Sequence, residues 1–368
     1  AAGGSRRPSH LPRLWGSMAQ LSVLPLPACF PTTLAPAACR FPEVDWIKAV
    51  GILAVVFIHA LPSGFEGSRS LADTWLGRMT RFAVPGFLAS SAFLYAGSKS
   101  SRSWSAVGLR LRRLLLPYLV FSLAAWCYMK AQEVVWSVDL TGTTTLPLQL
   151  LFGSALGPYY YVFVVVYLTL ATPLIARLPR RVLPWAALVA VALHFASEVR
   201  FIDLPLFWHF RSPLRHFGPF LLGWCARLGH GGLLEFLRGR RLIALRGALL
   251  AACILGGVAL AVLDPFGSAV SAVEFAQAYL MVALVFFMSI DGPTPPAIIS
   301  WLSNASYPIY LSHMMFVILV HQAVPFAPGA FSPLRNAAAW AAGLGNAAAL
   351  VLVVRELLGE ERARKWVG

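Results

Sequence analysis

Long apolar segments recur along this chain, and they constrain its fold more than any other feature. An α-helix rises about 1.5 Å per residue, so about 20 consecutive apolar residues are needed to cross a bilayer. Inside a bilayer the backbone must satisfy its own hydrogen bonds, which separate segments of this length do as helices. We therefore expect an all-α, polytopic transmembrane bundle of about ten spans, formed by residues 45–62, 81–97, 114–131, 159–176, 182–197, 214–229, 242–263, 271–290, 298–323 and 335–354.

The composition also indicates a membrane protein. Hydrophobic residues make up 58% of the chain and charged residues only 12%, with a mean hydropathy of +0.70. Soluble domains usually contain about 25% charged residues. The excess of 30 Lys and Arg over 15 Asp and Glu could indicate a nucleic-acid partner, but in a membrane protein basic residues gather in cytoplasmic loops.

The distribution of these basic residues predicts the orientation of the spans. When the N-terminus is placed in the cytoplasm, 22 of the 30 Lys and Arg fall in cytoplasmic segments and eight fall outside. This bias follows the positive-inside rule and predicts that both termini are cytoplasmic. It accounts for the sequence pI of about 10.2 without any nucleic acid.

The chain divides into one large membrane domain and two tails. Residues 1–41 contain repeated prolines that interrupt any apolar helix, so we expect a disordered tail or an extension there. Residues 42–356 form a single transmembrane domain, and residues 357–368 a cytoplasmic tail. The apolar run Leu146–Leu156 is too short to cross a membrane and is expected to lie at its interface.

The first span carries an unusual set of ionisable residues. Asp45, Lys48 and His59 lie along one side of an otherwise apolar helix. Lys48 and His59 are about three turns and about 16 Å apart, at nearly the same azimuth. Ionisable groups within a membrane are costly and indicate function, so we take these three as candidate catalytic residues. A membrane histidine can also serve only as a hydrogen-bonding group between helices, and that alternative stays open.

A second candidate set is the pair Arg110 and Arg113 at the start of the third span. At i and i+3 they project from one helix face, and two guanidinium groups there suit the phosphates of a cytosolic cofactor. The alternative interpretation is that they are ordinary positive-inside anchors.

Five stretches of the chain together form a recognisable pattern. They are DWIKAVGILAVVFIHA, RFAVPGFLASSAFLYAG, RLRRLLLPYLVFSL, PYYYVFVVVYLTLATPLI and WLSNASYPIYLSH. In this order, over Phe41 to Arg355, they resemble the acyltransferase-3 family of membrane acyltransferases. The chain is similar to the surface-polysaccharide O-acetyltransferase branch of that family.

This resemblance implies a reaction and roles for residues. It implies that an acyl group, usually acetyl from cytosolic acetyl-CoA, is transferred to a hydroxyl of a glycan or lipid-linked sugar at the outer face. His59 matches the essential histidine, Lys48 its basic partner, and Arg110 with Arg113 the pair that contacts acyl-CoA. Whether His59 acts as a base or is itself acylated stays open. Lys48 departs from the commoner arginine, because a lysine lacks a bidentate fork.

Other residues near the outer half are weaker candidates. His313 and Tyr310 fall within the ninth span, where they could line the reaction chamber or only hydrogen-bond in the interior. Histidines, Glu198 and aromatic residues gather around the third outer loop. They suit a sugar ring, but an interfacial aromatic belt has the same composition, and we favour the belt.

The sequence therefore predicts a multi-pass O-acyltransferase of the bacterial inner membrane. Its donor is acyl-CoA and its acceptor a surface glycan or lipid-linked saccharide. No permanently bound cofactor is expected, and the five scattered cysteines give no zinc-ligand spacing, so no metal is expected either. The alternative is a non-enzymatic transporter or export factor for cell-surface polysaccharide, with the same polar residues lining a path.

Overall fold

The computed structural model describes residues 40–62, 70–136, 145–199, 201–202, 205–263, 272–324 and 331–366. Residues Phe41–Gly368 form one compact unit. Nearly all of the predicted N-terminal tail and the last residues of the predicted cytoplasmic tail lie outside the described residues. The predicted domain limits therefore stay predictions.

The described residues are mostly helical, without any strand, and each predicted apolar segment coincides with a helix over most of its length. The all-α prediction is thus confirmed. The helices that contain the ten segments are α1 (Pro42–Ala60), α3 (Ala83–Ala96), α4 (Trp104–Trp136), α6 (Tyr160–Ile175), α7 (Leu183–Glu198), α9 (Pro213–Phe236), α10 (Arg240–Leu263), α11 (Ala272–Ser289), α12 (Ala297–Ala323) and α13 (Pro333–Leu358).

Helix α4 differs most from its predicted bounds. It has 33 residues and extends beyond residues 114–131 at both ends. The added residues include Arg, Gln and Glu, which are too polar to be part of an apolar span but are good helix formers. Apolarity alone therefore underestimates the length of a helix whose ends leave the membrane.

Short helices lie between the long ones and after the last of them. They are α2 (Leu71–Met79), α5 (Leu146–Phe152), the 3₁₀ turn η1 (Gly157–Tyr159), α8 (Leu206–His209) and α14 (Glu360–Trp366). Ser70 caps α2, because its hydroxyl oxygen accepts a hydrogen bond from the backbone N–H of Asp73. Helix α5 falls in the run that was expected to be interfacial.

Five of the described helical segments are long and apolar enough to cross a membrane: those within α4, α10, α11 and α13, and the segment Gly157–Ile175. Helices α3 and α7 are shorter, with 14 and 16 residues, and α1 carries Glu43, Asp45 and Lys48 near its start. The chain is an integral membrane protein, while its number of spans and the side on which its termini lie stay predictions.

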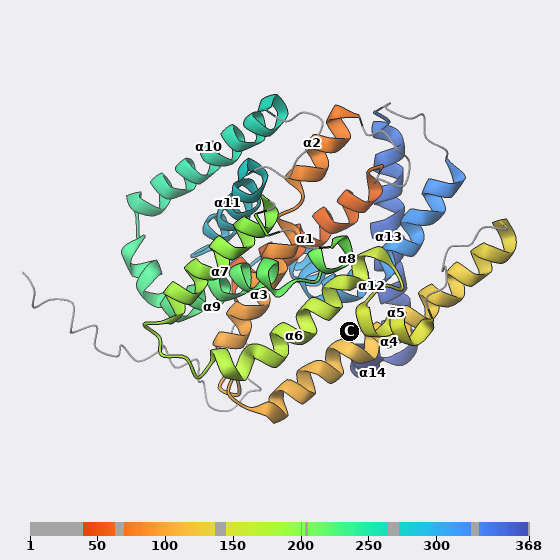
Figure 1. Cartoon of the computed structure of the whole chain (residues 1–368), viewed down its shortest axis with the longest axis horizontal. Coiled ribbons are helices and arrows are strands. Elements are labelled where there is room, and N and C mark those ends of the chain that lie inside the picture. The colour runs from red at the N-terminus through yellow and green to blue at the C-terminus, as the bar shows by residue number, and fades with distance from the viewer. Residues whose placement is uncertain are drawn as a thin grey trace, which may run out of the picture. The chain divides into compact units, whose positions relative to one another are not determined.

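Helix α1 packs against α3, α11, α12 and α13, and runs among them in Figure 1. Helix α9 packs against α3 and α7. The approach of α3 and α9 depends on Gly223, because a β-carbon there would collide with the backbone carbonyl of Ala89. The central position of α1 places its ionisable residues inside the bundle.

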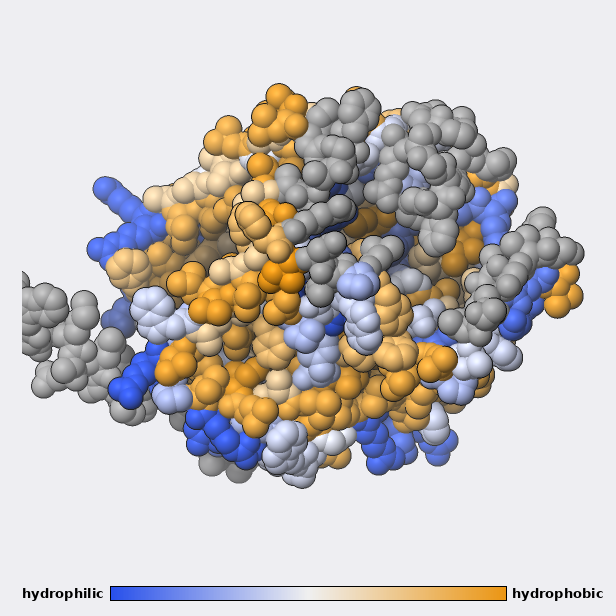
Figure 2. Space-filling view, in the orientation of Figure 1, coloured by the Kyte–Doolittle hydropathy of each residue, from blue (hydrophilic) through white to orange (hydrophobic). Residues whose placement is uncertain are grey.

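The outer surface is strongly apolar. In Figure 2 hydrophobic side chains cover most of the coloured part of the visible face, and the most hydrophilic ones lie mainly at its margins. Helix α10 illustrates this, since Leu255 and Val262 are 68% and 70% exposed. Exposed apolar side chains over a whole helix are expected where lipid rather than water is the neighbour.

Candidate active site

The three candidate residues of α1 lie at two different ends of that helix. Asp45 is buried, and its Oδ1 accepts a hydrogen bond of 2.7 Å from the hydroxyl of Ser303 on α12. Lys48 is half-buried one turn further on. His59 is about 21 Å from Asp45 along the helix. We call these the Lys48 end and the His59 end of the bundle; they cannot form one compact catalytic group.

His59 meets a second imidazole, that of His313 on α12. Their ring centroids are 5.4 Å apart. His59 is half-buried, whereas His313 has no exposed surface. Both were singled out from the sequence, and the packing of α12 on α1 brings them together.

The tautomer of His313 follows from its neighbours. Its Nδ1 lies 2.7 Å from the backbone carbonyl of Tyr310 and 3.2 Å from that of Ile309. Carbonyl oxygens only accept hydrogen bonds, so Nδ1 carries the proton and Nε2 keeps a lone pair. Nε2 is buried and has no hydrogen-bond partner among the described residues. A buried acceptor without a partner is costly, and such atoms gather at functional sites.

Tyrosines hold α12 in place beside His313. The hydroxyl of Tyr310 donates to the backbone carbonyl of Pro158, and that of Tyr159 donates to the carbonyl of Leu311 at 2.5 Å. These bonds fix α12 against η1, the turn that precedes α6. The ring of Tyr310 lies 6.1 Å from His313, so it forms a wall of the interior beside the pair. Its hydroxyl is already used as a donor to the protein.

The backbone of His59 is held by residues that the sequence analysis did not identify. Nε2 of His321 lies 3.2 Å from the carbonyl of His59, so this nitrogen donates. Nδ1 of His321 then accepts a hydrogen bond of 2.9 Å from Nη2 of Arg335. An arginine on α13 thus orients a histidine on α12, which in turn holds the end of α1.

Arg110 and Arg113 lie in different surroundings, although both are on α4. The guanidinium of Arg110 is 4.5 Å from the ring centroid of Tyr95, a cation–π contact, and its Nη1 is buried without a hydrogen-bond partner among the described residues. Arg113 is exposed. Nη1 of Arg110 is therefore free to bind an anion, whereas Arg113 can contact one only at the protein surface.

Comparison with known proteins gives one match. The model of the acyltransferase-3 family, which describes an acyltransferase domain, matches residues 41–354. The chain belongs to the acyltransferase-3 family. No curated protein and no solved structure matches it. Membership makes the chain a membrane acyltransferase and agrees with the resemblance carried by the five sequence stretches.

This acyltransferase-3 protein also contains a buried ionic network at the His59 end. Glu198 of α7 is ion-paired with Arg215 in the first turn of α9, and His194 lies 3.4 Å from the same carboxylate oxygen. The other ring nitrogen of His194 is 2.8 Å from the hydroxyl of Tyr279. Nη1 of Arg215 donates to Nδ1 of His209 at 3.0 Å.

The residues that were predicted to form an aromatic belt fall into two groups, one exposed and one buried. Phe207 and Trp208 are exposed, as a belt requires, but His194 and Glu198 are buried and bonded to other helices. Arg215 was not singled out from the sequence. It could have been found from the sequence, because it is a charged residue inside the apolar segment 214–229, and such a position indicates a functional or paired residue.

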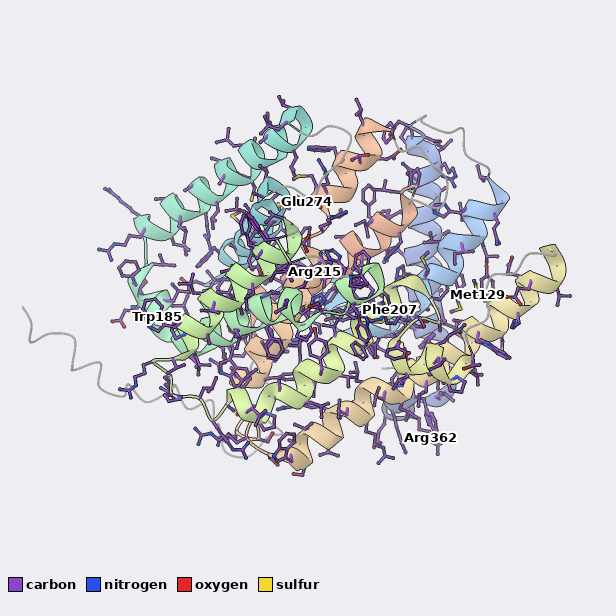
Figure 3. The ribbon with its side chains drawn as sticks, viewed as in Figure 1. Met129, Trp185, Phe207, Arg215, Glu274 and Arg362 are labelled. Atoms are coloured by element: carbon purple, nitrogen blue, oxygen red, sulfur yellow. The ribbon has the colours of Figure 1, made fainter. Side chains whose placement is uncertain are left out.

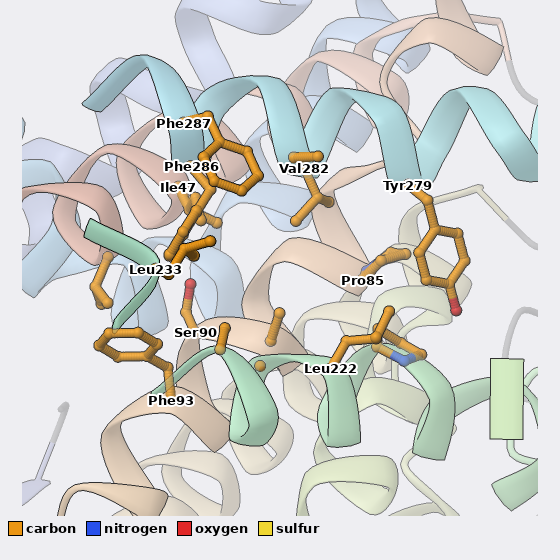
Figure 4. A pocket seen from close by; sticks show the side chains of 16 residues that line it. Ile47, Pro85, Ser90, Phe93, Leu222, Leu233, Tyr279, Val282, Phe286 and Phe287 are labelled. Carbon is orange, nitrogen blue, oxygen red and sulfur yellow. The ribbon is translucent and has the colours of Figure 1, made fainter. Parts of the chain in front are cut away.

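An apolar cavity of about 260 Å³ lies between α1, α3, α9 and α11 (Figure 4). Its lining includes Ile47, Phe93 and Val282, with the hydroxyl of Ser90 pointing into it. Neither His59 nor His313 lines it. Among the described residues no group of three His, Cys, Asp or Glu is placed to hold a metal ion.

Proposed function

We propose that this protein is an O-acyltransferase that moves an acyl group, acetyl in the simplest case, from cytosolic acyl-CoA to a hydroxyl of a surface glycan or lipid-linked sugar. The observation that carries the proposal is the pairing of His59 with His313 in the interior of an acyltransferase-3 bundle. The protein would act in a bacterial inner membrane, with acyl-CoA as a substrate and no permanently bound cofactor.

The chemistry that we propose needs one base near the acceptor hydroxyl. His59 removes the hydroxyl proton while the oxygen attacks the thioester carbonyl of acyl-CoA. The new C–O bond forms, the C–S bond breaks, and the proton passes to the departing CoA thiolate. A neutral imidazole suits this role because its unperturbed pKa lies near neutrality. In the alternative route His59 takes the acyl group first and then passes it to the hydroxyl.

The acyl donor would bind from the Lys48 end. Arg110 supports this part of the proposal, because its buried Nη1 has no hydrogen-bond partner among the described residues and a CoA phosphate would provide one. Lys48 lies on the same helix as His59 and could add charge along the donor. The separation of about 16 Å between Lys48 and His59 suits an extended donor that enters at one end and reacts near the other.

The test is transfer of label from radiolabelled acetyl-CoA by the purified protein to a panel of soluble and lipid-linked glycans. We expect labelled product with at least one acceptor and its loss in the variant His59→Ala. The matched control is His230→Gln, which keeps a donor to its partner Glu43 at the Lys48 end and should retain activity. Equal product from wild type and His59→Ala, both correctly folded, would contradict the proposal and favour a transporter.

A further inference from the structure

Three arginines converge at the His59 end, and the reaction proposed above does not use them. Arg81 follows α2, Arg211 precedes α9, and Arg215 lies in its first turn. Arg81 is ion-paired with Glu274 of α11 and Arg215 with Glu198 of α7. These two helices are in contact, and the rings of His194 and Phe275 meet there at 4.9 Å, so the two ion pairs lie near each other. Arg211 lies one turn before Arg215 in the sequence. We call these three residues the arginine cluster. Figure 3 shows Arg215 between Glu274 and Phe207.

The cluster is unexpected from the predicted topology. Only eight of the 30 basic residues fall outside on that topology, and the cluster with Arg78 accounts for four of them. In the described residues Arg215 is ion-paired with Glu198 and Arg81 with Glu274, whereas the hydrogen bonds of Arg211 go to backbone carbonyls. The three guanidinium groups of the cluster are thus accompanied by two paired carboxylates among the described residues.

The arginines are held in place but keep free donors. Arg211 donates from Nε to the carbonyl of Phe152 at 2.8 Å and from Nη1 to that of Phe207 at 2.9 Å. Nε of Arg215 is buried without a hydrogen-bond partner among the described residues. Arg81 is ion-paired with Glu274 at 2.5 Å, and its side chain is 43% exposed. Fixed guanidinium groups with free N–H donors suit an oxyanion, to which they can bind in bidentate fashion.

Exposed aromatic rings lie directly beside these donors. Phe207 and Phe210 are each 41% exposed and Trp208 is 46% exposed. The guanidinium of Arg211 is 4.0 Å from the ring centroid of Phe207, and that of Arg215 is 5.5 Å from the ring of Phe210. An aromatic face accepts the apolar face of a sugar, while a neighbouring arginine binds its charged group.

The start of α6 lies between the cluster and His59. The ring of Tyr160 is 5.6 Å from that of Phe210, and the ring of the next residue, Tyr161, is 5.4 Å from that of Tyr310. From Tyr310 the ring of His313 is 6.1 Å away, and that of His59 a further 5.4 Å. The aromatic side chains and arginines thus lie at the same end of the bundle as the proposed base.

We propose that the arginine cluster binds an oxyanion of the acceptor glycan, the carboxylate of an acidic sugar or a phosphate attached to a sugar, while Phe207, Trp208 and Phe210 contact the ring. This assignment rests on the proposed function, since it names the class of acceptor for that reaction. It distinguishes an acidic glycan from a neutral one as the substrate.

The test measures binding in the absence of any acyl donor, so that its result does not depend on transfer. Tetragalacturonate, galactose 1-phosphate, maltotetraose and farnesyl diphosphate are titrated calorimetrically into the purified full-length protein in detergent. We expect tetragalacturonate to bind at least about tenfold more tightly than neutral maltotetraose, and added salt to reduce this advantage. His59→Ala should bind tetragalacturonate as the wild type does, even if it transfers nothing.

The variant Arg81→Gln tests whether the arginine cluster itself binds the acidic sugar. Arg78 stays 3.6 Å from Glu274, so the carboxylate keeps a cationic partner when Arg81 is removed. We expect about a tenfold loss of tetragalacturonate affinity with maltotetraose binding unchanged, and partial recovery in Arg81→Lys. The control Arg177→Gln, an exposed arginine at the other end of α6, should bind like wild type.

Three results would overturn the assignment. The first is equal affinity for tetragalacturonate and maltotetraose. The second is an Arg81→Gln protein that binds every probe like the wild type. The third is binding of farnesyl diphosphate but of neither acidic sugar, which would assign the arginines to a lipid carrier. Galactose 1-phosphate binding without tetragalacturonate binding would support a sugar phosphate as the oxyanion.

Discussion

The histidine pair and the Glu198 network lie at the same end of the bundle, but they differ in whether their buried polar groups have partners. Around Glu198 the charges are paired, because Arg215 is ion-paired with the carboxylate and His194 is close to it, although Nε of Arg215 keeps a free N–H. Around His59 no carboxylate partner is found among the described residues, and the Nε2 of His313 has no hydrogen-bond partner.

We infer from this difference that the Glu198 network holds helices together, whereas the histidine pair is available for the reaction. Buried ions must be paired, because an unpaired one costs several kcal/mol, of the order of 3–5 when a buried pair is broken. A neutral imidazole can be buried with an unused lone pair at much lower cost, about 1–3 kcal/mol. The histidine pair keeps a basic nitrogen available, at that cost, and the network supplies rigidity beside it.

The largest effect on stability is expected for Glu198→Gln. This change leaves the guanidinium of Arg215 without its ion pair in a mostly buried site, and should lower the free energy of unfolding by about 3 kcal/mol. Thermal unfolding in detergent measures it. The double variant Glu198→Gln with Arg215→Met removes both charges and should recover much of the loss. A stable Glu198→Gln protein would show that the network does not hold the helices.

A smaller effect, on donor binding, is expected for Arg110→Ala. Loss of its guanidinium should raise the KM for acetyl-CoA about tenfold, the value of one charged hydrogen bond, with a smaller change in kcat. Arg113→Ala is the matched comparison, because Arg113 is exposed on the same helix. Steady-state kinetics distinguish the two. Equal effects would favour a general positive charge over a specific contact of Arg110.

The smallest effect is expected for Asp45→Asn, although Asp45 was a catalytic candidate. The hydroxyl of Ser303 can donate to an amide oxygen as it does to the carboxylate, so the loss of stability should stay below about 1 kcal/mol. Asp45 also lies about 21 Å from His59 along α1, so kcat should hardly change. A loss of 100-fold or more in kcat with intact stability would return Asp45 to the catalytic residues.

The positions of the helices could be predicted from the sequence because each depends on a local property. Runs of about 20 apolar residues placed α1 and α10 to α13 within a few residues of their bounds. The helices that were missed, such as α2 and α14, have a mixed composition, and α2 depends on the Ser70 cap. Short helices of this kind are fixed by caps and neighbours more than by their own periodicity.

The candidate site could be predicted only in part, because its contacts join residues far apart in sequence. Helical periodicity brought attention to His59 and residue type to His313, but nothing local indicates that the two rings meet, 5.4 Å apart, across α1 and α12. The hydrogen bond between Asp45 and Ser303 could not be predicted for the same reason, because the two residues are far apart in sequence. Arg215 and Glu274 lie inside apolar segments, which is a sequence signal that a search for charged residues within spans would find.

The most direct test of the account is a double-mutant cycle on the histidine pair. Acetyl transfer is measured for wild type, His59→Gln, His313→Gln and the double variant, each with its thermal unfolding recorded. If the two imidazoles act as one site, each single change lowers kcat by about 100-fold or more, and the double variant is no worse than His59→Gln alone. Losses that multiply in a folded double variant, or full activity without His59, would contradict the account.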